Sequence, residues 1–487
     1  MGIPGPEPQD DGGVGAIGAA GGLHLYQLWL HAEYGPVVRF QLPGAGTAVS
    51  IADPVLLEAT ARLDERPAAL FDFLSPLCEA GNLQVIGAEE HAPWRRVLLE
   101  VFAGRPSHER HFGEFVALVE GLADRWGALG DGAAVGLQKE LTSLSLRMIC
   151  AYALGGDDLS GSGSRNGSRG RNDPSVVDPD GVIAAFETVL TESLGQRYQV
   201  PGDQEARAKR VEGALGYLRA TVDRVLTARR GPARQGPARQ SPARQEGAHR
   251  DRSDLVGALA DAGMSPARIR DTVMVTMLAA HHTTGVAVSW TLHLLGRHPE
   301  VAERVTEELD RVLGERAVPD YADLRRLTYL EMVLKESMRL RPPGPYGARE
   351  TTEPLVVGAY EVPAGTTVFY PFWAVHMNPA YWPEPERFLP ERFTPDAVAE
   401  RPRLAHIPFG IGPRSCEGAQ LAMVEAELAL AVLLKRFRFR PVPGHEVAPV
   451  ERFVLWAEDD IRMTLSPRDA PVFSRSARRT RGRPSSS

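Results

Sequence analysis

Cysteine is scarce in this chain of 487 residues, which has only Cys78, Cys150 and Cys416. A small, odd number in so long a chain does not support a disulfide framework. Three scattered cysteines also cannot supply the cluster of ligands that an iron–sulfur centre requires. Both absences favour a reducing compartment, and we expect the protein to be cytoplasmic.

Long apolar runs and an excess of basic residues are missing as well. No stretch reaches the roughly 18–20 apolar residues that a membrane span needs. The N-terminal sequence MGIPGPEPQDDGG has neither the basic nor the apolar region of a signal peptide. The formal net charge of −7 argues against a nucleic-acid-binding protein, because the domains of such proteins are usually strongly basic. We therefore expect no membrane span and no nucleic-acid partner.

Several segments are too polar, or too rich in glycine and proline, to join a packed core. We expect disorder in residues 1–22 and in the basic tail 468–487, and flexible insertions at about 156–180 and 229–252. The second insertion holds a threefold PARQ repeat, which we interpret as a solvated loop. The remaining chain, residues 23–467, shows no clear division in composition, so we expect one large domain.

Periodic patterns across this domain predict a mainly α protein with a minor β part. The strongest helix covers residues 269–296, after a Ser265-Pro266 cap, and it is apolar on nearly all sides. Such a helix lies at the centre of a large domain. Further helices are predicted at 53–62, 299–313, 321–341 and 418–436, and strands at 37–42, 354–360, 366–371 and 452–457.

The segment PFGIGPRSCEGAQLA (residues 408–422) is the most informative part of the sequence. Gly410, Gly412 and the following proline exclude a helix before the cysteine, whereas the apolar spacing after Gly418 is helical. Cys416 is therefore predicted on a tight loop that runs into a helix N-terminus, where backbone N–H groups stabilise a thiolate. Such a thiolate could ligate a haem iron or act as a nucleophile, and an inert buried cysteine is the third option.

The spacing Phe409-Gly410-x-Gly412-x-Arg414-x-Cys416-x-Gly418, followed by Ala422, resembles the haem-binding loop of the cytochrome P450 family. The resemblance covers roughly residues 23–467. It implies haem b as the cofactor, with the Cys416 thiolate as the iron ligand. It also implies that other residues of the loop bind the cofactor, namely Phe409, Gly410, Arg414 and Gly418.

Another set of residues resembles a structural element of the same family. Glu336 and Arg339 share a helix face at i and i+3, and they match the family's buried Glu-x-x-Arg pair. Arg392, in the PERF sequence at 390–393, matches the third member. The resemblance implies that these side chains hold the fold behind the cysteine loop.

Cations that could bind the haem propionates occur at two places. His91 and Arg95 lie one helical turn apart and match the family's His-x-x-x-Arg, which grips a propionate. Arg349, 14 residues before Pro363 of the VPAG turn, matches another propionate arginine. Without the resemblance, all three would be interpreted as ordinary surface cations.

The central helix carries Ala279-Ala280-His281-His282-Thr283-Thr284, which resembles the family's oxygen-activation motif. Thr283 takes the place of the catalytic threonine, whereas His282 replaces the usual acid and Ala280 the usual glycine. The His-His-Thr run looks like the bacterial sterol 14α-demethylase version. His282 either relays protons, since histidine titrates near neutral pH, or points away and leaves the relay to water. His281 is expected to pack within the protein.

Taken together, these motifs imply the triangular fold of a soluble, actinobacterial-type member of the family. The implied activity is that of a haem-thiolate monooxygenase, which inserts one oxygen atom of O2 into a hydrophobic small molecule. Electrons would come from a ferredoxin or flavodoxin and its NAD(P)H reductase. A secondary metabolite such as a polyketide or terpenoid is the expected substrate, with a steroid as a further option. Two alternatives stay open: a member that uses peroxide or catalyses rearrangement or coupling, and a haem-binding sensor without turnover.

The resemblance also predicts where substrate and redox partner bind. The substrate pocket is expected near residues 66–88, 181–200, 275–283 and 343–348, where Phe71 and Tyr346 suggest apolar walls. Arg96 and Arg403 are expected on the thiolate side of the haem, as candidates for docking an acidic ferredoxin.

Overall fold

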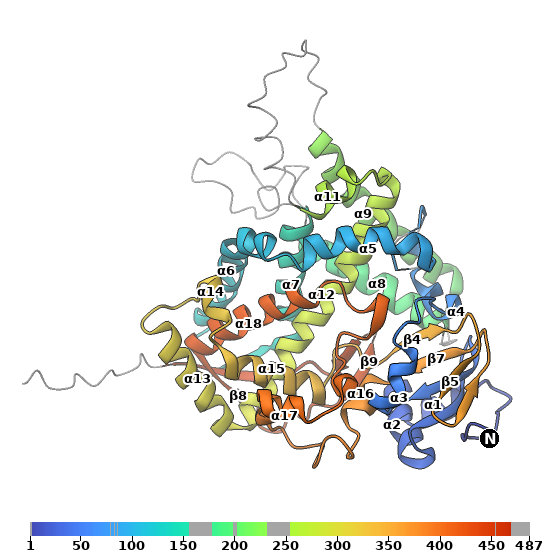
Figure 1. Cartoon of the computed structure of the whole chain (residues 1–487). Coiled ribbons are helices and arrows are strands. Elements are labelled where there is room, and N and C mark those ends of the chain that lie inside the picture. Colours follow the sequence, from blue (N-terminus) through green and yellow to red (C-terminus); the bar gives the residue numbers. More distant parts are fainter. Residues whose placement is uncertain are drawn as a thin grey trace, which may run out of the picture.

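A computed structural model of the protein describes residues 2–77, 79–81, 83–84, 86–154, 178–197, 202–230, 254–452 and 454–468. These residues form a mainly helical protein with small sheets, as the sequence predicts. Figure 1 shows the four-stranded sheet and the N-terminal helices on one side, and the larger helical part on the other. Most of the predicted insertions at 156–180 and 229–252, and all but the first residue of the predicted tail 468–487, lie outside the described residues.

The helices follow one another along the chain with short connections. In order they are α1 (Val14–Ala19), α2 (Leu23–Tyr34), α3 (Pro54–Leu57), α4 (Ala68–Phe71), α5 (Ala88–Phe102), α6 (Arg105–Gly127), α7 (Leu137–Leu154), α8 (Pro179–Arg197), α9 (Gln204–Arg230), α11 (Leu255–Asp261), α12 (Pro266–Arg297), α13 (Pro299–Leu313), α14 (Tyr321–Leu324), α15 (Thr328–Leu340), α16 (Phe372–His376), α17 (Pro395–Ala399) and α18 (Ala419–Arg436).

The strands form one larger sheet and three small ones within the described residues. The larger sheet has the order β1-β2-β7-β4, in which only the β2–β7 pair is parallel. A second sheet has the order β3-β11-β8, and the pairs β9–β10 and β5–β6 are antiparallel hairpins. The bounds are β1 (Val37–Leu42), β2 (Gly46–Ile51), β3 (Ala133–Gly136), β4 (Gly347–Glu350), β5 (Leu355–Val357), β6 (Tyr360–Val362), β7 (Thr367–Tyr370), β8 (Phe437–Pro441), β9 (Pro449–Arg452), β10 (Val454–Ala457) and β11 (Arg462–Pro467).

The N-terminal segment differs from the disorder expected for residues 1–22. Its extended start runs beside β1, where the Arg39 N–H donates to the carbonyl of Pro4 at 2.7 Å. Helix α1 follows, and its Ile17 side chain is buried. The physical reason is that β1 is an edge strand, whose outer backbone groups need partners that the N-terminal segment supplies.

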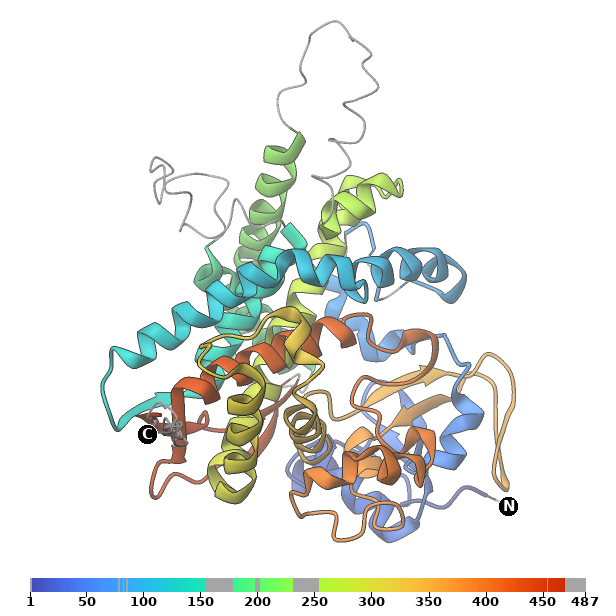
Figure 2. The same ribbon diagram turned by 60° about the vertical axis from the view of Figure 1, so that its left-hand side comes forward.

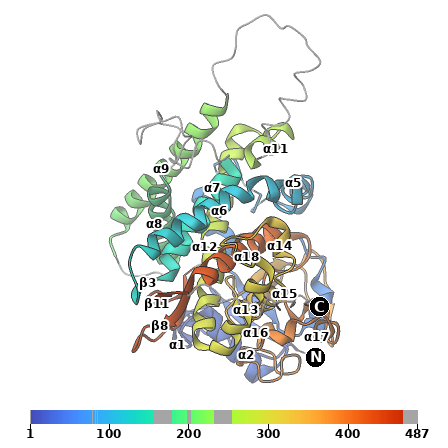
Figure 3. The ribbon, with the colours of Figure 1, turned by 90° about the vertical axis from the view of Figure 1, so that its left-hand side faces the viewer.

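Helix α12 is the centre of the main core, as its all-round apolar sequence predicts. The Ser265 hydroxyl caps it by accepting the Arg268 N–H, and Pro266 occupies its first turn. It packs along α7 and against α18, α15 and β8. Figures 2 and 3 show α12 passing through the helical part of the molecule, with α18 beside it.

Two predicted elements are divided in the structure. The helix predicted at 321–341 is split into α14 and α15, because Glu308 of α13 accepts the N–H groups of Tyr329 and Leu330 and caps the second helix. The strand predicted at 354–360 is the hairpin β5–β6, which turns at Gly358 with φ of 58°. Both differences arise from contacts that periodicity along the chain does not register.

Candidate active site

The loop before α18 presents Cys416 at the N-terminal side of that helix, as predicted. Gly410 and Gly412 have φ of 73° and 71°, values that favour glycine. A side chain at Gly412 would also collide with the carbonyl oxygen of Ala61. The loop closes on itself where the Cys416 N–H donates to the Phe409 carbonyl at 2.8 Å. The cysteine is therefore held in a fixed position by its own backbone.

The surroundings of Cys416 disfavour a free thiolate. Burial, followed by the charge of Glu417, raises the pKa of the thiol to about 11, although the Gly418 N–H and Arg95 act in the opposite direction. The side chain nevertheless has accessible surface, so protein encloses it without filling the space beside it. A cation bound to the sulfur would hold it as a thiolate at neutral pH.

His91 and Arg95 of α5 both reach the cysteine loop. Arg95 donates to the Ser415 carbonyl at 2.9 Å, to the Ser415 hydroxyl at 3.0 Å and to the Glu417 carboxylate at 2.5 Å. His91 Nε2 lies 3.6 Å from the same carboxylate, and its buried Nδ1 has no hydrogen-bond partner. The sequence spacing that suggested a shared helix face therefore brings both cations to the loop that carries Cys416.

Further arginines gather beside this pair. Arg349 of β4 is buried, and its Nε has no hydrogen-bond partner. The Nε of Arg66 is buried without a partner too, and burial, followed by repulsion from Arg349 and Arg414, lowers the pKa of Arg66 to about 9. The sequence analysis missed Arg66, since nothing in its local pattern signals that a distant part of the chain will bring arginines beside it.

This cluster fits a dianionic cofactor. The arginines at 66, 95, 349 and 414 surround the carboxylates of Asp64 and Glu417, so cations outnumber anions four to two. Buried, repelling cations with unpaired N–H groups are costly unless an anion joins them. The two propionates of haem supply that charge, and Cys416 supplies the iron ligand. The residues present therefore fit the group that the sequence implies.

Arg414 also has contacts that the sequence does not reveal. Its Nε donates to Asp64 at 2.5 Å, and its terminal nitrogens donate to the carbonyls of Leu83 at 3.3 Å and Ile86 at 2.8 Å. The guanidinium thus braces the segment between α4 and α5 against the cysteine loop. A contribution to propionate binding would come from its remaining N–H groups.

One stripe of α12 is accessible although the helix is central. Between Asp271 and Leu295, the only residues that are not buried are Thr276, Ala279, Ala280 and Thr283. Their spacing of i, i+3, i+4 and i+7 puts them on one face. The stripe faces a space that the described side chains leave unfilled, and α18, which begins just after Cys416, packs against the same helix. The Thr283 hydroxyl donates to the Ala279 carbonyl at 2.9 Å.

His281 and His282 lie off this stripe. His281 is fully buried, its Nδ1 lies 3.1 Å from the Met277 carbonyl oxygen, and it stacks on Phe186, which matches the expectation of a packed residue. His282 meets Trp456 of β10, and its Nδ1 has no hydrogen-bond partner. Burial, followed by repulsion from His281, lowers the pKa of His282 to about 2. The contact with Trp456 could not be foreseen from the sequence.

Glu336, Arg339 and Arg392 meet in one buried cluster, as their motifs predict. Arg339 forms a double hydrogen bond with the Glu336 carboxylate at 2.7 and 2.8 Å, and Arg392 Nε lies 3.5 Å from it. Arg339 also donates to the carbonyls of His376 and Arg387. Paired and hydrogen-bonded, these charges can stay inside the protein, where they join α15 to the loop before the PERF turn.

Comparison with known proteins gives consistent matches. The sequence model of the cytochrome P450 family matches residues 205–465. A cyclooctat-9-en-7-ol 5-monooxygenase of Streptomyces melanosporofaciens is 31% identical over 375 residues, which cover 74% of this chain and 73% of that relative. A cyclooctatin synthase of the same organism is 39% identical over 225 residues, which cover 45% of this chain and 49% of that relative. The fruit-fly protein Cytochrome P450 4c3 is 39% identical over 204 residues, covering 41% of this chain and 38% of that relative.

The fold, the cysteine loop and these matches define a haem-thiolate protein. The chain belongs to the cytochrome P450 family, whose members bind haem iron through a cysteine thiolate. The chain spans about half or less of the length of the last two relatives. Among the helices of the described residues, none is both long enough and apolar enough to cross a membrane. Cys150 is free and buried, and Cys78 lies outside the described residues.

Proposed function

We propose that the protein is a monooxygenase that inserts one oxygen atom of O2 into a hydrophobic small molecule. The observation that carries the proposal is the combination of the Cys416 loop with the accessible stripe of α12 that includes Thr283. Haem bound through a thiolate activates O2, and the other oxygen atom leaves as water after two electrons and two protons are taken up. We propose a cytoplasmic enzyme of the bacterial type, supplied by a ferredoxin or flavodoxin and its NAD(P)H reductase.

The residues of this chain would divide the work between cofactor binding and proton delivery. His91, Arg95 and Arg349, with Arg66 and part of Arg414, hold the propionates by charge-assisted hydrogen bonds. Phe409, Gly410 and Gly418 shape the loop against which the haem lies. Thr283 presents its hydroxyl in the accessible stripe, where it can donate a proton to bound oxygen.

For the substrate we propose a terpenoid. The support is that two relatives are named for cyclooctatin and cyclooctat-9-en-7-ol. A polyketide is the next candidate, and the sterol-demethylase-like His-His-Thr run keeps a steroid as a third. In all three cases the substrate is largely apolar, which suits the alanines at 279 and 280 in the accessible stripe.

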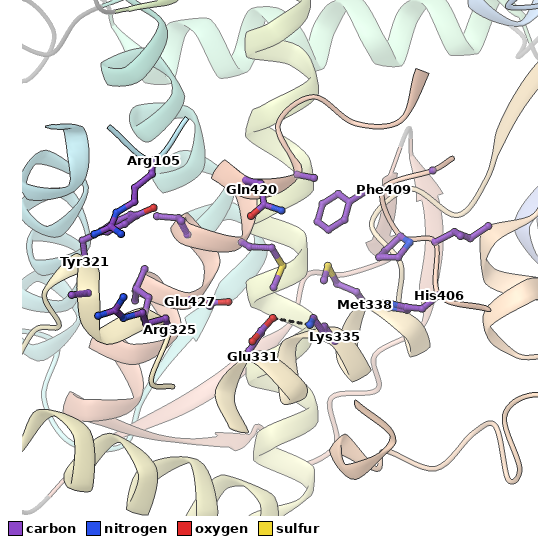
Figure 4. Close-up of a pocket in the computed structure, with 18 residues that line it drawn as sticks. Arg105, Tyr321, Arg325, Glu331, Lys335, Met338, His406, Phe409, Gln420 and Glu427 are labelled. Atoms are coloured by element: carbon purple, nitrogen blue, oxygen red, sulfur yellow. Dashed lines mark ion pairs between the residues drawn. The ribbon is translucent and has the colours of Figure 1, made fainter. Parts of the chain in front are cut away.

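For the redox partner we propose docking at a pocket of about 580 Å³ behind the cysteine loop. Figure 4 shows its basic side chains, Arg105, Arg325 and Lys335, with Phe409 of the loop at one end. Lys335 pairs with Glu331 at 2.7 Å, and burial raises the pKa of Glu427 to about 8, so that this carboxyl group is neutral at physiological pH. The pocket therefore has net positive charge, which suits an acidic partner.

The expected Arg403 is engaged elsewhere, in an ion pair with Glu58 at 2.5 Å. Arg96 is exposed on α5 and stays a candidate.

The test is NADPH-driven turnover with surrogate ferredoxin and reductase, with O2 consumption and oxygenated product measured together. We expect a terpenoid to be oxygenated with one O2 consumed per product. Oxygenation that proceeds only with added peroxide would favour the peroxide-driven alternative. Ligand binding without any turnover, with haem and thiolate spectrum intact, would favour the sensor.

A further inference from the structure

A second cavity, of about 500 Å³, lies between the N-terminal helices and the sheet. Its walls come from α1, the start of α2, the end of β1, α4, β4, β7 and β9. Apart from Tyr346 and Glu451, every side chain that lines it is apolar, or the residue is a glycine or proline. Its size and its apolar walls with few polar groups are typical of small-molecule sites.

The polar end of this cavity is built around Glu451. The Tyr346 hydroxyl donates to the Glu451 carboxylate, and His24 Nδ1 lies 3.4 Å from it. His24 is fully buried and stacked on Trp373 at 5.7 Å, and neither of its ring nitrogens has a hydrogen-bond partner. A carboxylate accepts about four hydrogen bonds, so Glu451 can accept more than the Tyr346 hydroxyl provides.

The cavity is continuous with the wall that contacts the catalytic helix. Val450 and Glu451 belong to β9, and β10 pairs with it so that Val450 lies opposite Trp456. Trp456 is the residue that meets His282, the neighbour of Thr283. On the other side, Ala348 lines the cavity directly before Arg349 of the haem cluster. One short hairpin and one strand thus separate the cavity from the haem site.

We propose that this cavity binds the substrate on its way to the haem, and that Glu451 selects substrates that carry a hydroxyl group on an apolar body. The proposal rests on the proposed function and specifies its substrate class. A hydroxyl donor satisfies Glu451, whereas the apolar remainder fills the walls of α1 and α4. A site built to bind a substrate hydroxyl discriminates strongly against an analogue that lacks it, because its buried polar groups then stay unpaired.

The experiment uses calorimetric binding of cedrol, a tricyclic terpene alcohol, and of its methyl ether, which has no donor. Gly18 lines the cavity on α1, and a Cβ there would meet nothing within 4 Å. We expect Gly18→Phe to fill the cavity and to weaken both ligands by about tenfold or more. Gly113→Phe is the matched control, since Gly113 is a helical glycine of α6 with equally open surroundings.

Variants at Glu451 test the selection. Wild type should bind cedrol about tenfold more tightly than the ether, and Glu451→Leu should remove this preference. Glu451→Gln, which still offers a carbonyl acceptor, should keep part of it and covers the case that the leucine variant fails to fold. Unchanged affinities in Gly18→Phe, or an unchanged preference in both Glu451 variants, would overturn the proposal. Because binding is measured without turnover, a protein that shows these effects and makes no product refutes the monooxygenase and leaves the cavity assigned.

Discussion

Trp456 of β10 meets His282 of α12 edge to face, with ring centroids 5.3 Å apart and an interplanar angle of 85°. The contact keeps water from the imidazole, which is why burial lowers its pKa to about 2. His282 is therefore neutral at physiological pH. A proton relay through this residue would use the two nitrogens of the neutral ring, with one accepting as the other donates.

Replacing the two residues of the oxygen-activation motif separates their roles. We expect Thr283→Ala to divert electrons to peroxide, because the hydroxyl that donates a proton is lost. Under the relay proposal, His282→Ala slows turnover by about tenfold or more and leaves the thiolate spectrum unchanged. His282→Asp should restore part of the rate. The measurement is product per NADPH, with peroxide quantified alongside; wild-type coupling in His282→Ala would assign the relay to water.

The identity of the iron ligand is tested by cysteine replacement. Cys416→Ser should abolish the red-shifted Soret band of the reduced protein with CO, since serine cannot supply the thiolate. Cys150→Ser is the control within the fold, because this thiol is buried in α7 and burial raises its pKa to about 12. Cys78→Ser should be equally silent. A retained band in Cys416→Ser would show that another residue binds the iron.

The buried carboxyl group of Glu425 on α18 predicts a pH-dependent stability. Thr284 of α12 hydrogen-bonds it, its Oε1 has no partner, and burial raises its pKa from 4.5 to about 8. A raised folded pKa means that the stabilisation is present below pH 4.5 and is lost as the pH rises through 8. Glu425→Gln has no such titration, so its stability relative to wild type should increase across this window.

The size of that increase should be a few kcal/mol, at about 1.4 kcal/mol per pKa unit. Thermal unfolding of both proteins at a series of pH values measures it. Glu307→Gln, on the exposed face of α13, controls for the change in net charge. A constant difference between Glu425→Gln and wild type across the series would contradict the prediction.

The parts of the fold that were predicted correctly are those that local sequence determines. Ser265 and Pro266 fix the start of α12, and the glycines at 410 and 412 fix the cysteine loop, because each acts on its own backbone. The break between α14 and α15 was missed because Glu308, from another helix, supplies the cap. The order in residues 2–22 was missed because it depends on the edge of β1.

The site shows the same division. Cys416 and the Glu336–Arg339 pair could be found from spacing alone, since their partners lie within one motif or on one helix face. Arg66 could not, because its meaning comes from Arg349, far along the chain. Glu451 and Trp456 gain their positions from strand pairing, which places one beside the N-terminal helices and the other beside α12.

Charge reversal at the pocket behind the cysteine loop tests where electrons enter. Arg325 is exposed, and no ion pair joins it to a described residue. Arg325→Glu should slow reduction by an acidic ferredoxin at low salt, and Arg96→Glu, if α5 belongs to the docking face, should do so too. The difference from wild type should shrink at high salt, because the Debye length falls from about 10 Å at 0.1 M to about 3 Å at 1 M. Lys209→Glu, exposed on α9, is the matched control, and stopped-flow reduction is the measurement. If Lys209→Glu slows reduction as much as Arg325→Glu does, the effect is one of net charge and the pocket is not the docking site.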